Sequence, residues 1–301
     1  MKVQVLMSTY NGEKYIQEQI DSILNQKGVE VDLLIRDDGS SDETISIIQK
    51  YINNDSRVTL YTGANLKSAK SFFDLVTKAS DADYYAFSDQ DDVWAVDKLE
   101  AAVKTLSTKD NTKPLLYYCN MKVVDENLNY LYVLHAHTKR TDHRYSVLTE
   151  YYAAGCTMVF NEAAKELCSN NIPQGNIMHD TWMEVLCQFF GTVYYDPNAY
   201  ILYRQHSNNV IGVSTSKLQK IQRKISRVLS DSKQPRYEFA RIIDSNIGTI
   251  LSQEDATEVK KIVNYKTSFK DWMTLLFDYK IKNSTVKDEV AFRLLTLIRR
   301  A

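Results

Sequence analysis

The segment 87–94 reads FSDQDDVW and places three carboxylates, Asp89, Asp91 and Asp92, within four positions. It continues the aromatic run 84–87, which has the composition of a buried strand. The acids therefore stand at the carboxyl end of a strand, the edge where open α/β sheets bind ligands. Residues two apart in an extended chain point the same way, so Asp89 and Asp91 can face one ligand. Such oxygen ligands suit Mg²⁺ or Mn²⁺ holding a phosphate, and the alternative is a solvated acidic turn.

Apolar segments of strand length alternate with helical patterns through the first third of the chain. Strands are expected at 3–7, 31–35, 58–61 and 84–87, and helices from Ile16, over 42–51 and over 69–79. Ser40 and Glu43 have the spacing of a capping box for the second of these helices. Alternation at this rhythm predicts a parallel, doubly wound sheet with right-handed crossovers.

The remaining chain continues this pattern and then becomes helical. Further strands are expected at 115–124, 130–134, 156–160, 193–195 and 201–203, and helices from Glu162 and over 179–190. From Ser216 onward the pattern is helical. The segment 217–228 combines five Lys and Arg residues with an apolar stripe. Such a helix lies on an anionic membrane or packs its stripe on its own domain, and periodicity supports both alternatives.

Composition and charge narrow the class of protein. With 301 residues, 44% hydrophobic and 25% charged, the chain has an ordinary globular composition, and its net charge of −1 offers no basic excess for nucleic acid. The four cysteines form neither CxxC pairs nor zinc-finger spacings, which favours reduced thiols. Met1 leads directly into a strand, and no apolar run approaches the roughly 20 residues that span a bilayer. We expect a cytoplasmic protein, with contact to a membrane surface left open.

A second acidic cluster, Asp37 and Asp38, follows the second expected strand, and the polar segment 8–11 follows the first. All of these residues fall at the same edge of the predicted sheet. The chain has neither a GxGxxG fingerprint nor a GxxxxGK[ST] loop, which disfavours dehydrogenases and P-loop enzymes. A metal ion held by Asp91 would then bind a diphosphate in place of a Gly-rich loop.

Several short motifs recur here in a familiar order: STYNG at 8–12, RDDGSSD at 36–42, SDQDD at 88–92, GCT at 155–157, HD at 179–180 and YRQH at 203–206, with Asn209. Together they resemble the inverting family 2 glycosyltransferases over about residues 1–212. The resemblance implies an α/β fold of the GT-A type, a nucleotide-binding domain over 1–212 and a C-terminal helical region over 213–301. The pair FSDQDDVW and YRQH is most similar to bacterial rhamnosyltransferases, which build cell-surface polysaccharides from dTDP-L-rhamnose.

The resemblance also implies roles for individual residues. The expected donor-binding residues are Thr9, Tyr10, Asn11, Asp38, Asn65, Lys70, Asp89, Gln90 and Arg204. Asp38 would bind the pyrimidine base, and Asp89 the ribose or the donor sugar. Asp91 would ligate Mg²⁺ or Mn²⁺, and His206 would reach this metal or the diphosphate. Asp180 matches the catalytic base, although many members have an acidic residue where this chain has His179.

The expected reaction is transfer of L-rhamnose from dTDP-L-rhamnose to a hydroxyl of a growing, lipid-linked cell-surface polysaccharide. The first alternative keeps this reaction class and uses a UDP-hexose as donor. A nucleotidyltransferase would need a Gly-rich, basic loop after the first strand, and the segment 8–13 supplies none. A binding module without activity would not need both acidic clusters together with Asp180 and His206. Whether the C-terminal helices bind the acceptor, a membrane or another copy of the chain stays open.

Overall fold

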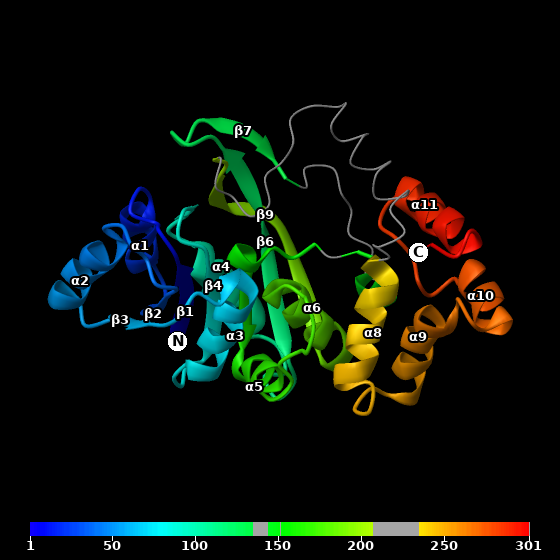
Figure 1. The fold of residues 1–301 in the computed structure, drawn as a ribbon. Helices are drawn as coiled ribbons and strands as arrows, with labels where there is room; N and C mark the ends of the chain where they lie inside the picture. Colours follow the sequence, from blue (N-terminus) through cyan, green and yellow to red (C-terminus); the bar gives the residue numbers. More distant parts are fainter. Residues whose placement is uncertain (135–143, 151, 207–234, 301) are drawn as a thin grey trace. The chain divides into compact units, whose positions relative to one another are not determined.

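The computed structural model describes residues 1–134, 144–150, 152–206 and 235–300 (Figure 1). These residues divide into two compact units. The first lies within 1–136, 152–172 and 176–205, and the second within 137–151, 173–175 and 206–301. The basic segment 217–228, Asn209 and the domain boundary expected near residue 212 lie outside the described residues, so the boundary stays a prediction.

One sheet forms the centre of the first unit. Its strands, in spatial order, are β3 (Val58–Thr62), β2 (Glu30–Asp37), β1 (Lys2–Thr9), β4 (Tyr84–Ser88), β8 (Met158–Asn161), β6 (Leu115–Val124), β9 (Thr192–Arg204) and β5 (Val93–Trp94), and β7 (Tyr130–Val133) pairs with β6. β1, β2, β3 and β4 pair in parallel, as do β6 and β9, whereas β8 runs antiparallel between β4 and β6. The predicted α/β architecture is confirmed.

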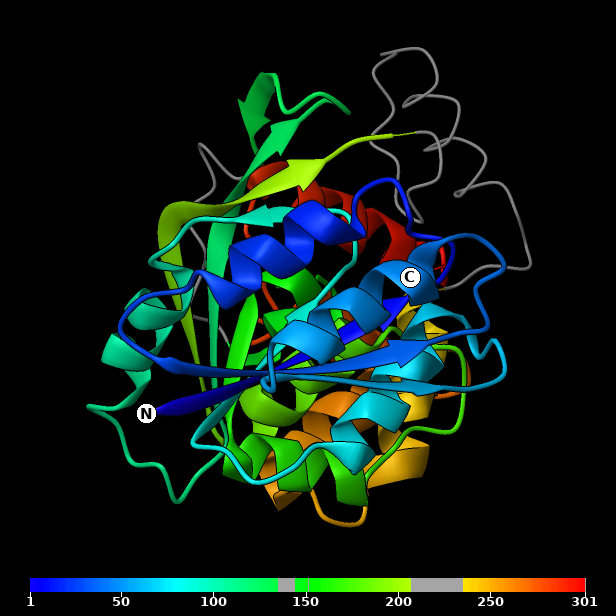
Figure 2. The same ribbon diagram turned by 90° about the vertical axis from the view of Figure 1, so that its left-hand side faces the viewer.

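Helices cover both faces of this sheet because side chains alternate along each strand. Val3, Val5 and Met7 of β1 pack in one core with α1 (Ile16–Leu24), α2 (Thr44–Asn54) and α4 (Lys98–Leu106). The opposite face carries α3 (Lys67–Lys78), α5 (Glu162–Asn170) and α6 (His179–Phe190). Figure 2 shows β1, β2 and β3 side by side, with α1 and α2 on one face and α3 on the other.

Two details of the sequence prediction are wrong. The strands expected at 193–195 and 201–203 form one strand, β9, because irregularities in its pairing with β6 between Cys119 and Lys122 absorb the turn signal near Pro197. The capping box is also absent: α2 begins at Thr44 with no side-chain cap, and the Ser40 hydroxyl instead donates to Asp37 at 2.5 Å.

The second unit is helical in its described part, as expected. It contains a 3₁₀ turn at Arg144–Leu148 and the helices α8 (Pro235–Ile247), α9 (Gln253–Asn264), α10 (Phe269–Leu276) and α11 (Val286–Leu297). Ser252, Ser268 and Thr285 cap α9, α10 and α11 through their hydroxyl oxygens. Among the described helices of either unit, none has the length and apolar content that a membrane span requires.

Candidate active site

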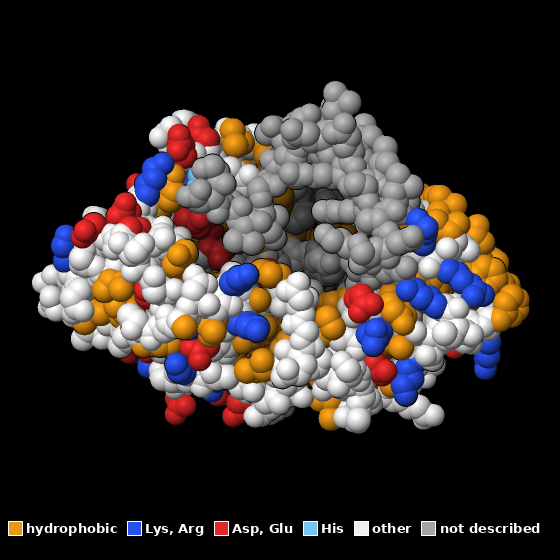
Figure 3. All heavy atoms as spheres, viewed as in Figure 1, with side chains coloured by type: hydrophobic (Ala, Val, Ile, Leu, Met, Phe, Trp, Pro, Cys, Tyr) orange, Lys and Arg blue, Asp and Glu red, His pale blue; other side chains and the backbone are white. Residues whose placement is uncertain are grey.

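The acidic loop, defined as residues 88–92, turns from β4 toward β5 at the carboxyl edge of the sheet. Burial raises the pKa of Asp89 to about 7, and the negative charges of Asp91 and Asp180 add to this rise. Carboxylates from the acidic loop and from α6, about 90 positions apart in the sequence, therefore act on one another. Figure 3 shows Asp and Glu side chains gathered in a hollow left of centre on this face of the molecule.

Asp180 lies in the first turn of α6, where the helix dipole favours an anion. Its Oδ2 accepts a hydrogen bond from the backbone N–H of Gly155 at 3.2 Å, and the side chain stays half-buried. A side chain at Gly155 would not fit, because an added Cβ would lie 2.6 Å from Nε2 of His179. The glycine of the GCT segment thus allows the backbone to approach the start of α6.

His179, which stands where the resemblance implies an acidic residue in many members, is a buried aromatic side chain. Its ring stacks on Phe72 with centroids 3.9 Å apart and meets Phe87 edge-on at 4.8 Å. Neither ring nitrogen has a hydrogen-bond partner among the described residues. Burial lowers the pKa of His179 to about 4, so the ring is neutral at physiological pH. His179 therefore packs the start of α6 against Phe72 and Phe87 and adds no charge next to Asp180.

Gln90 joins the acidic loop to the segment that follows β1. Its Oε1 accepts hydrogen bonds from the Thr9 hydroxyl at 2.5 Å and from the Tyr10 N–H at 2.9 Å, and its Nε2 donates to the Tyr10 carbonyl at 3.1 Å. An added Cβ at Gly12 would lie 2.3 Å from this Oε1, which explains the glycine of the STYNG motif. Thr9 and Gln90, expected as donor contacts, thus fix two loops to each other, and the Tyr10 side chain is left exposed.

Asn11 joins the same segment to the loop after β2. It adopts a left-handed backbone conformation with φ 48°, which asparagine tolerates better than most residues. Its Oδ1 accepts from the Ser41 N–H at 2.9 Å, and its own N–H donates to the Ser40 hydroxyl oxygen at 2.9 Å. Asn11 is exposed, so this bridging role leaves one side of it open to solvent.

Arg204, at the end of β9, holds the acidic loop from the other side. Its Nε donates to the Asp91 carbonyl at 3.0 Å, and its backbone N–H donates to the Asp92 carboxylate at 3.2 Å. The same guanidinium pairs with Glu18, donates to the Glu126 carbonyl at 2.6 Å and stacks over the ring of Tyr15. Arg204 is buried, and in this structure its charge is engaged by protein groups. Its expected contact with the donor stays a prediction.

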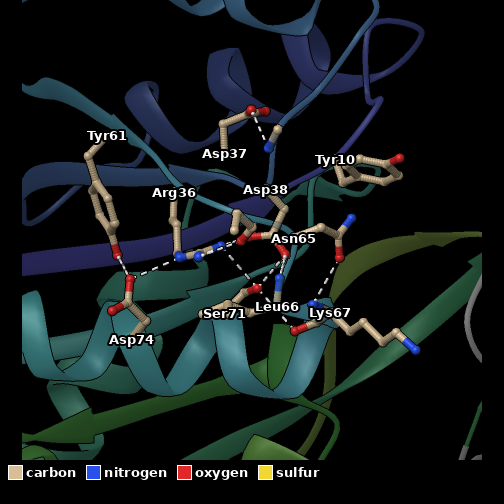
Figure 4. A network of polar contacts seen from close by, with 12 residues as sticks. Tyr10, Arg36, Asp37, Asp38, Tyr61, Asn65, Leu66, Lys67, Ser71 and Asp74 are labelled. Carbon is tan, nitrogen blue, oxygen red and sulfur yellow. Dashed lines mark hydrogen bonds and ion pairs between the residues drawn. The ribbon is translucent and has the colours of Figure 1, made fainter.

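Asp38 lies in a buried polar network beneath the loop between β3 and α3 (Figure 4). It pairs with Arg36, and its Oδ2 accepts from the Ser71 hydroxyl at 2.6 Å and from the Leu66 N–H at 3.1 Å. Arg36 continues the network through Asp74 at 2.9 Å. Because Asp38 is buried, ion-paired with Arg36 and already accepts two hydrogen bonds through Oδ2, a base could bond to Asp38 only by sharing or replacing one of these partners.

Exposed residues lie around this network, and the sequence singled out some of them as donor contacts. Asn65 and Lys70 are exposed, as donor contacts must be, and Figure 4 shows Tyr10 and Asn65 beyond the buried carboxylate. Lys67, which the sequence did not single out, has φ 64°, and its N–H donates to the Asn65 side chain at 3.0 Å. A left-handed lysine is uncommon, so this loop has a specific conformation that motif spacing does not reveal.

The residues of the acidic loop fit a divalent cation. One ligand atom each from Asp89, Asp92 and Cys156 lie within 4.8 Å of one another, and Asp92 Oδ2 is buried with no hydrogen-bond partner in the described part of the chain. Burial raises the pKa of Cys156 well above its usual range, so this thiol stays protonated beside Asp92. Hard carboxylate oxygens are the ligands that Mg²⁺ and Mn²⁺ prefer. The assignment of Asp91 as a ligand stays a prediction, as does that of His206, a half-buried residue of the second unit.

Lys98 is a further buried charge near this loop that the sequence did not single out. Its Nζ lies 3.3 Å above the ring of Trp94 and has no hydrogen-bond partner among the described residues. Burial lowers its pKa to about 8, and the neighbouring acidic groups Cys119, Cys156 and Asp92 oppose this shift. A lysine six positions after the acidic loop carries no distinct sequence signal, because most lysines are exposed.

Comparison with known proteins identifies the family of this chain. The sequence profile named Glycosyl transferase family 2 matches residues 4–168, more than half of the chain. The chain belongs to glycosyl transferase family 2. A curated relative of this glycosyltransferase, the dTDP-rhamnosyl transferase RfbG of Shigella flexneri, is 29% identical over 228 residues, covering 70% of this chain and 75% of RfbG. Another, the UDP-Glc:alpha-D-GlcNAc-diphosphoundecaprenol beta-1,3-glucosyltransferase WfgD of Escherichia coli, is 32% identical over 125 residues, covering 42% of this chain and 47% of WfgD.

Solved structures confirm the expected GT-A fold. TarS residues 1–349 of S. aureus, in complex with UDP-GlcNAc, superposes with a TM-score of 0.57 at 17% identity, covering all of this glycosyltransferase and 92% of that chain. The mannosyltransferase PcManGT of Pyrobaculum calidifontis, in complex with GDP-Man and Mn²⁺, gives 0.51 at 14% identity, covering 99% and 86%. At these identities the similarity establishes the fold, and the chemistry of this chain has to be argued from its own residues.

The buried state of His179 predicts a pH-dependent stability. An unfolded histidine has a pKa near 6.5 and His179 has a pKa of about 4, so only the unfolded chain binds the proton between these values. The contribution of His179 to the free energy of unfolding is complete above pH 6.5, and it is lost as the pH falls toward 4. We expect the stability difference between wild type and His179→Asn to shrink by about 2 kcal/mol from pH 7 to pH 5.

Urea unfolding of both proteins at several pH values measures this difference. Because the free energy of unfolding of the variant is subtracted from that of wild type, the effects of all other titrating groups cancel. A difference that does not vary with pH would mean that His179 is hydrogen-bonded or charged in the folded protein.

Proposed function

We propose that this family 2 glycosyltransferase is an inverting enzyme that transfers L-rhamnose from dTDP-L-rhamnose to a hydroxyl of a lipid-linked saccharide. The observation that carries the proposed reaction is the electrostatic proximity of Asp89, Asp91 and Asp180, which come from two separate segments of the first unit. The donor assignment rests on the FSDQDDVW and YRQH motifs and on the similarity to RfbG over 70% of the chain.

Inversion is a single displacement, so the acceptor hydroxyl attacks the face of the sugar opposite the leaving group. In our proposal Asp180 accepts the proton of that hydroxyl as it attacks. The hydrogen bond from the Gly155 N–H to Oδ2 supports this role, because it fixes the orientation of the carboxylate and leaves it half-exposed. The sugar passes through an oxocarbenium-like state, by analogy with glycoside hydrolysis.

Asp91, together with Asp89, would hold the Mg²⁺ or Mn²⁺ that the fold family implies. When bound, this ion would neutralise the negative charge that develops on the diphosphate leaving group. The hydrogen bonds of Arg204 and Gln90 would keep the acidic loop in place when the donor binds. His206 would reach the diphosphate or the same ion from the chain directly after β9.

The proposed donor site has an exposed layer and a supporting layer. Tyr10, Asn65 and Lys70 are exposed and would contact the nucleotide directly. Asp38 would contribute to base recognition through the loop that it anchors at Leu66. Asp89 would lie next to the donor sugar. Four other expected donor residues would act mainly by fixing the loops, because their side chains already bond to protein groups: Thr9, Asn11, Gln90 and Arg204.

The alternative donor is a UDP-hexose. The name of WfgD specifies a UDP-glucose donor and a diphosphoundecaprenol-linked acceptor, and TarS was solved with UDP-GlcNAc. The acceptor part of our proposal follows from WfgD, because a lipid-linked saccharide is presented at a membrane. On this basis we also propose that the enzyme works at the cytoplasmic face of that membrane, with residues 1–212 forming the catalytic domain.

Asp180→Asn is the direct test of the base. Asparagine keeps an oxygen that can accept from the Gly155 N–H but cannot take a proton, so we expect transfer to fall by about 10³-fold while donor binding is unchanged. Initial rates of nucleoside diphosphate release with acceptor measure transfer, and Asp110→Asn, at an exposed aspartate, is the matched control. A loss of less than about tenfold would place the base at another residue.

The donor is tested by thermal unfolding with Mn²⁺ and a set of sugar nucleotides. A ligand that binds only the folded state raises the melting temperature, by the equivalent of about 2.7 kcal/mol at 100 times its Kd. We expect dTDP-L-rhamnose to stabilise the protein at concentrations where UDP-glucose and UDP-GlcNAc do not. Free dTDP and UDP separate the contribution of the nucleotide from that of the sugar. Stronger stabilisation by a UDP-hexose would replace our donor assignment with the alternative.

A further inference from the structure

The second unit exposes an apolar surface that its own described residues do not cover. We call it the α10–α11 surface, and it consists of Phe269, Phe277, Tyr279, Val286, Val290, Leu294, Leu297 and Ile298. The exposed fractions reach 67% for Phe269, 74% for Phe277 and 83% for Val286. Contiguous apolar surface of this kind marks interaction sites on folded proteins.

The pattern along α11 shows that this exposure is not a frayed helix end. Val286, Val290 and Leu294 recur every four residues, so they form one stripe along the helix. The opposite side of α11 buries Phe292 and Thr296 completely. The helix therefore has two apolar faces, of which the unit's own packing needs only one.

Contacts between α10 and α11 hold the two halves of this surface next to each other. The indole N–H of Trp272 in α10 donates to the Thr296 carbonyl in α11 at 2.9 Å. The Arg299 guanidinium lies over the Trp272 ring, and its Nη1 donates to the Lys266 carbonyl at 2.9 Å. Phe269 packs against the same indole with centroids 5.6 Å apart. Aromatic side chains next to Lys and Arg are typical of helices that lie in a membrane interface.

The charge of this region is predominantly positive. Residues 265–301 contain eight Lys and Arg against four Asp and Glu, although the whole chain has a net charge of −1. The acids are used inside the unit: Asp278 accepts from Lys261, and Glu289 accepts from Arg293.

The two remaining acids, Asp271 and Asp288, lie in the first turns of α10 and α11, where an anion is favourable. Lys270, Lys282 and Lys287 are exposed. Figure 3 shows blue Lys and Arg side chains next to the orange side chains over α10 and α11, at the right of the view.

We propose that the α10–α11 surface binds the surface of an anionic lipid membrane. The apolar side chains would enter the boundary between headgroups and acyl chains, and Lys270, Lys282 and Lys287 would bind the lipid phosphates. A second copy of the chain fits less well, because a twofold interface brings the same patch of each copy together and both patches carry the same excess of positive charge. This inference does not depend on the donor or on the reaction.

Vesicle binding by the full-length chain tests the proposal. We expect the protein to sediment with phosphatidylcholine vesicles that contain phosphatidylglycerol, and more weakly with phosphatidylcholine alone. The double substitution Phe277→Ser and Leu294→Ser should weaken binding by about tenfold or more, because it removes two apolar side chains from the interface. Lys270→Gln with Lys287→Gln should reduce the preference for phosphatidylglycerol. Leu131→Ser, a half-exposed leucine on β7, is the matched control and should bind as wild type does.

Two results would overturn the proposal. If the Phe277→Ser and Leu294→Ser variant binds vesicles as wild type does, any lipid contact lies elsewhere, for example in the basic segment 217–228. If wild type is a dimer by light scattering and the same variant is a monomer, with no vesicle binding by either, the surface binds a second copy. Unchanged melting temperatures, expected for exposed positions, would show that the variants are folded.

Discussion

The structure of the site depends on holding several carboxylates close together against their mutual repulsion. The acidic loop achieves this because it is bonded on two sides: Gln90 ties it to the segment after β1, and Arg204 ties it to the end of β9. Arg204 supplies the only kind of side chain that can bring a fixed positive charge and several directed donors at once. With the loop fixed in this way, Asp89 and Asp91 can keep their positions although burial and repulsion raise the pKa of Asp89.

The remaining features of the site follow from the need to bring α6 to this loop. Gly155 has no side chain, so its backbone can lie against His179 and donate to Asp180. His179 is neutral and stacks on Phe72, which lets the start of α6 pack on the sheet without adding another charge. A site with excess negative charge and few compensating cations is suited to a ligand that brings positive charge with it, as a diphosphate bound with a divalent cation does.

Sequence reasoning predicted the fold better than the contacts among the candidate site residues. The strands and the acids at their carboxyl ends follow from periodicity, so the α/β class could be predicted. The role of Asp180 came from the family resemblance and stays a prediction. The partners of Gln90, Asn11 and Asp38 could not, because they lie on loops distant in the sequence. Burial of Lys98 depends on tertiary packing, which no local pattern encodes. The turn signal near Pro197 predicts two strands, and the structure has one, β9, because its pairing with β6 overrides that local signal.

The central claim is that Asp89, Asp91 and Asp180 form one catalytic site that takes a divalent cation with its donor. Anomalous diffraction from crystals grown with Mn²⁺ and dTDP tests it most directly, because it locates the ion independently of activity. We expect a Mn²⁺ peak at about 2.2 Å from a carboxylate oxygen of Asp91 or Asp89 and in contact with the diphosphate. A nucleotide bound in the first unit with Mn²⁺ away from both carboxylates would contradict it.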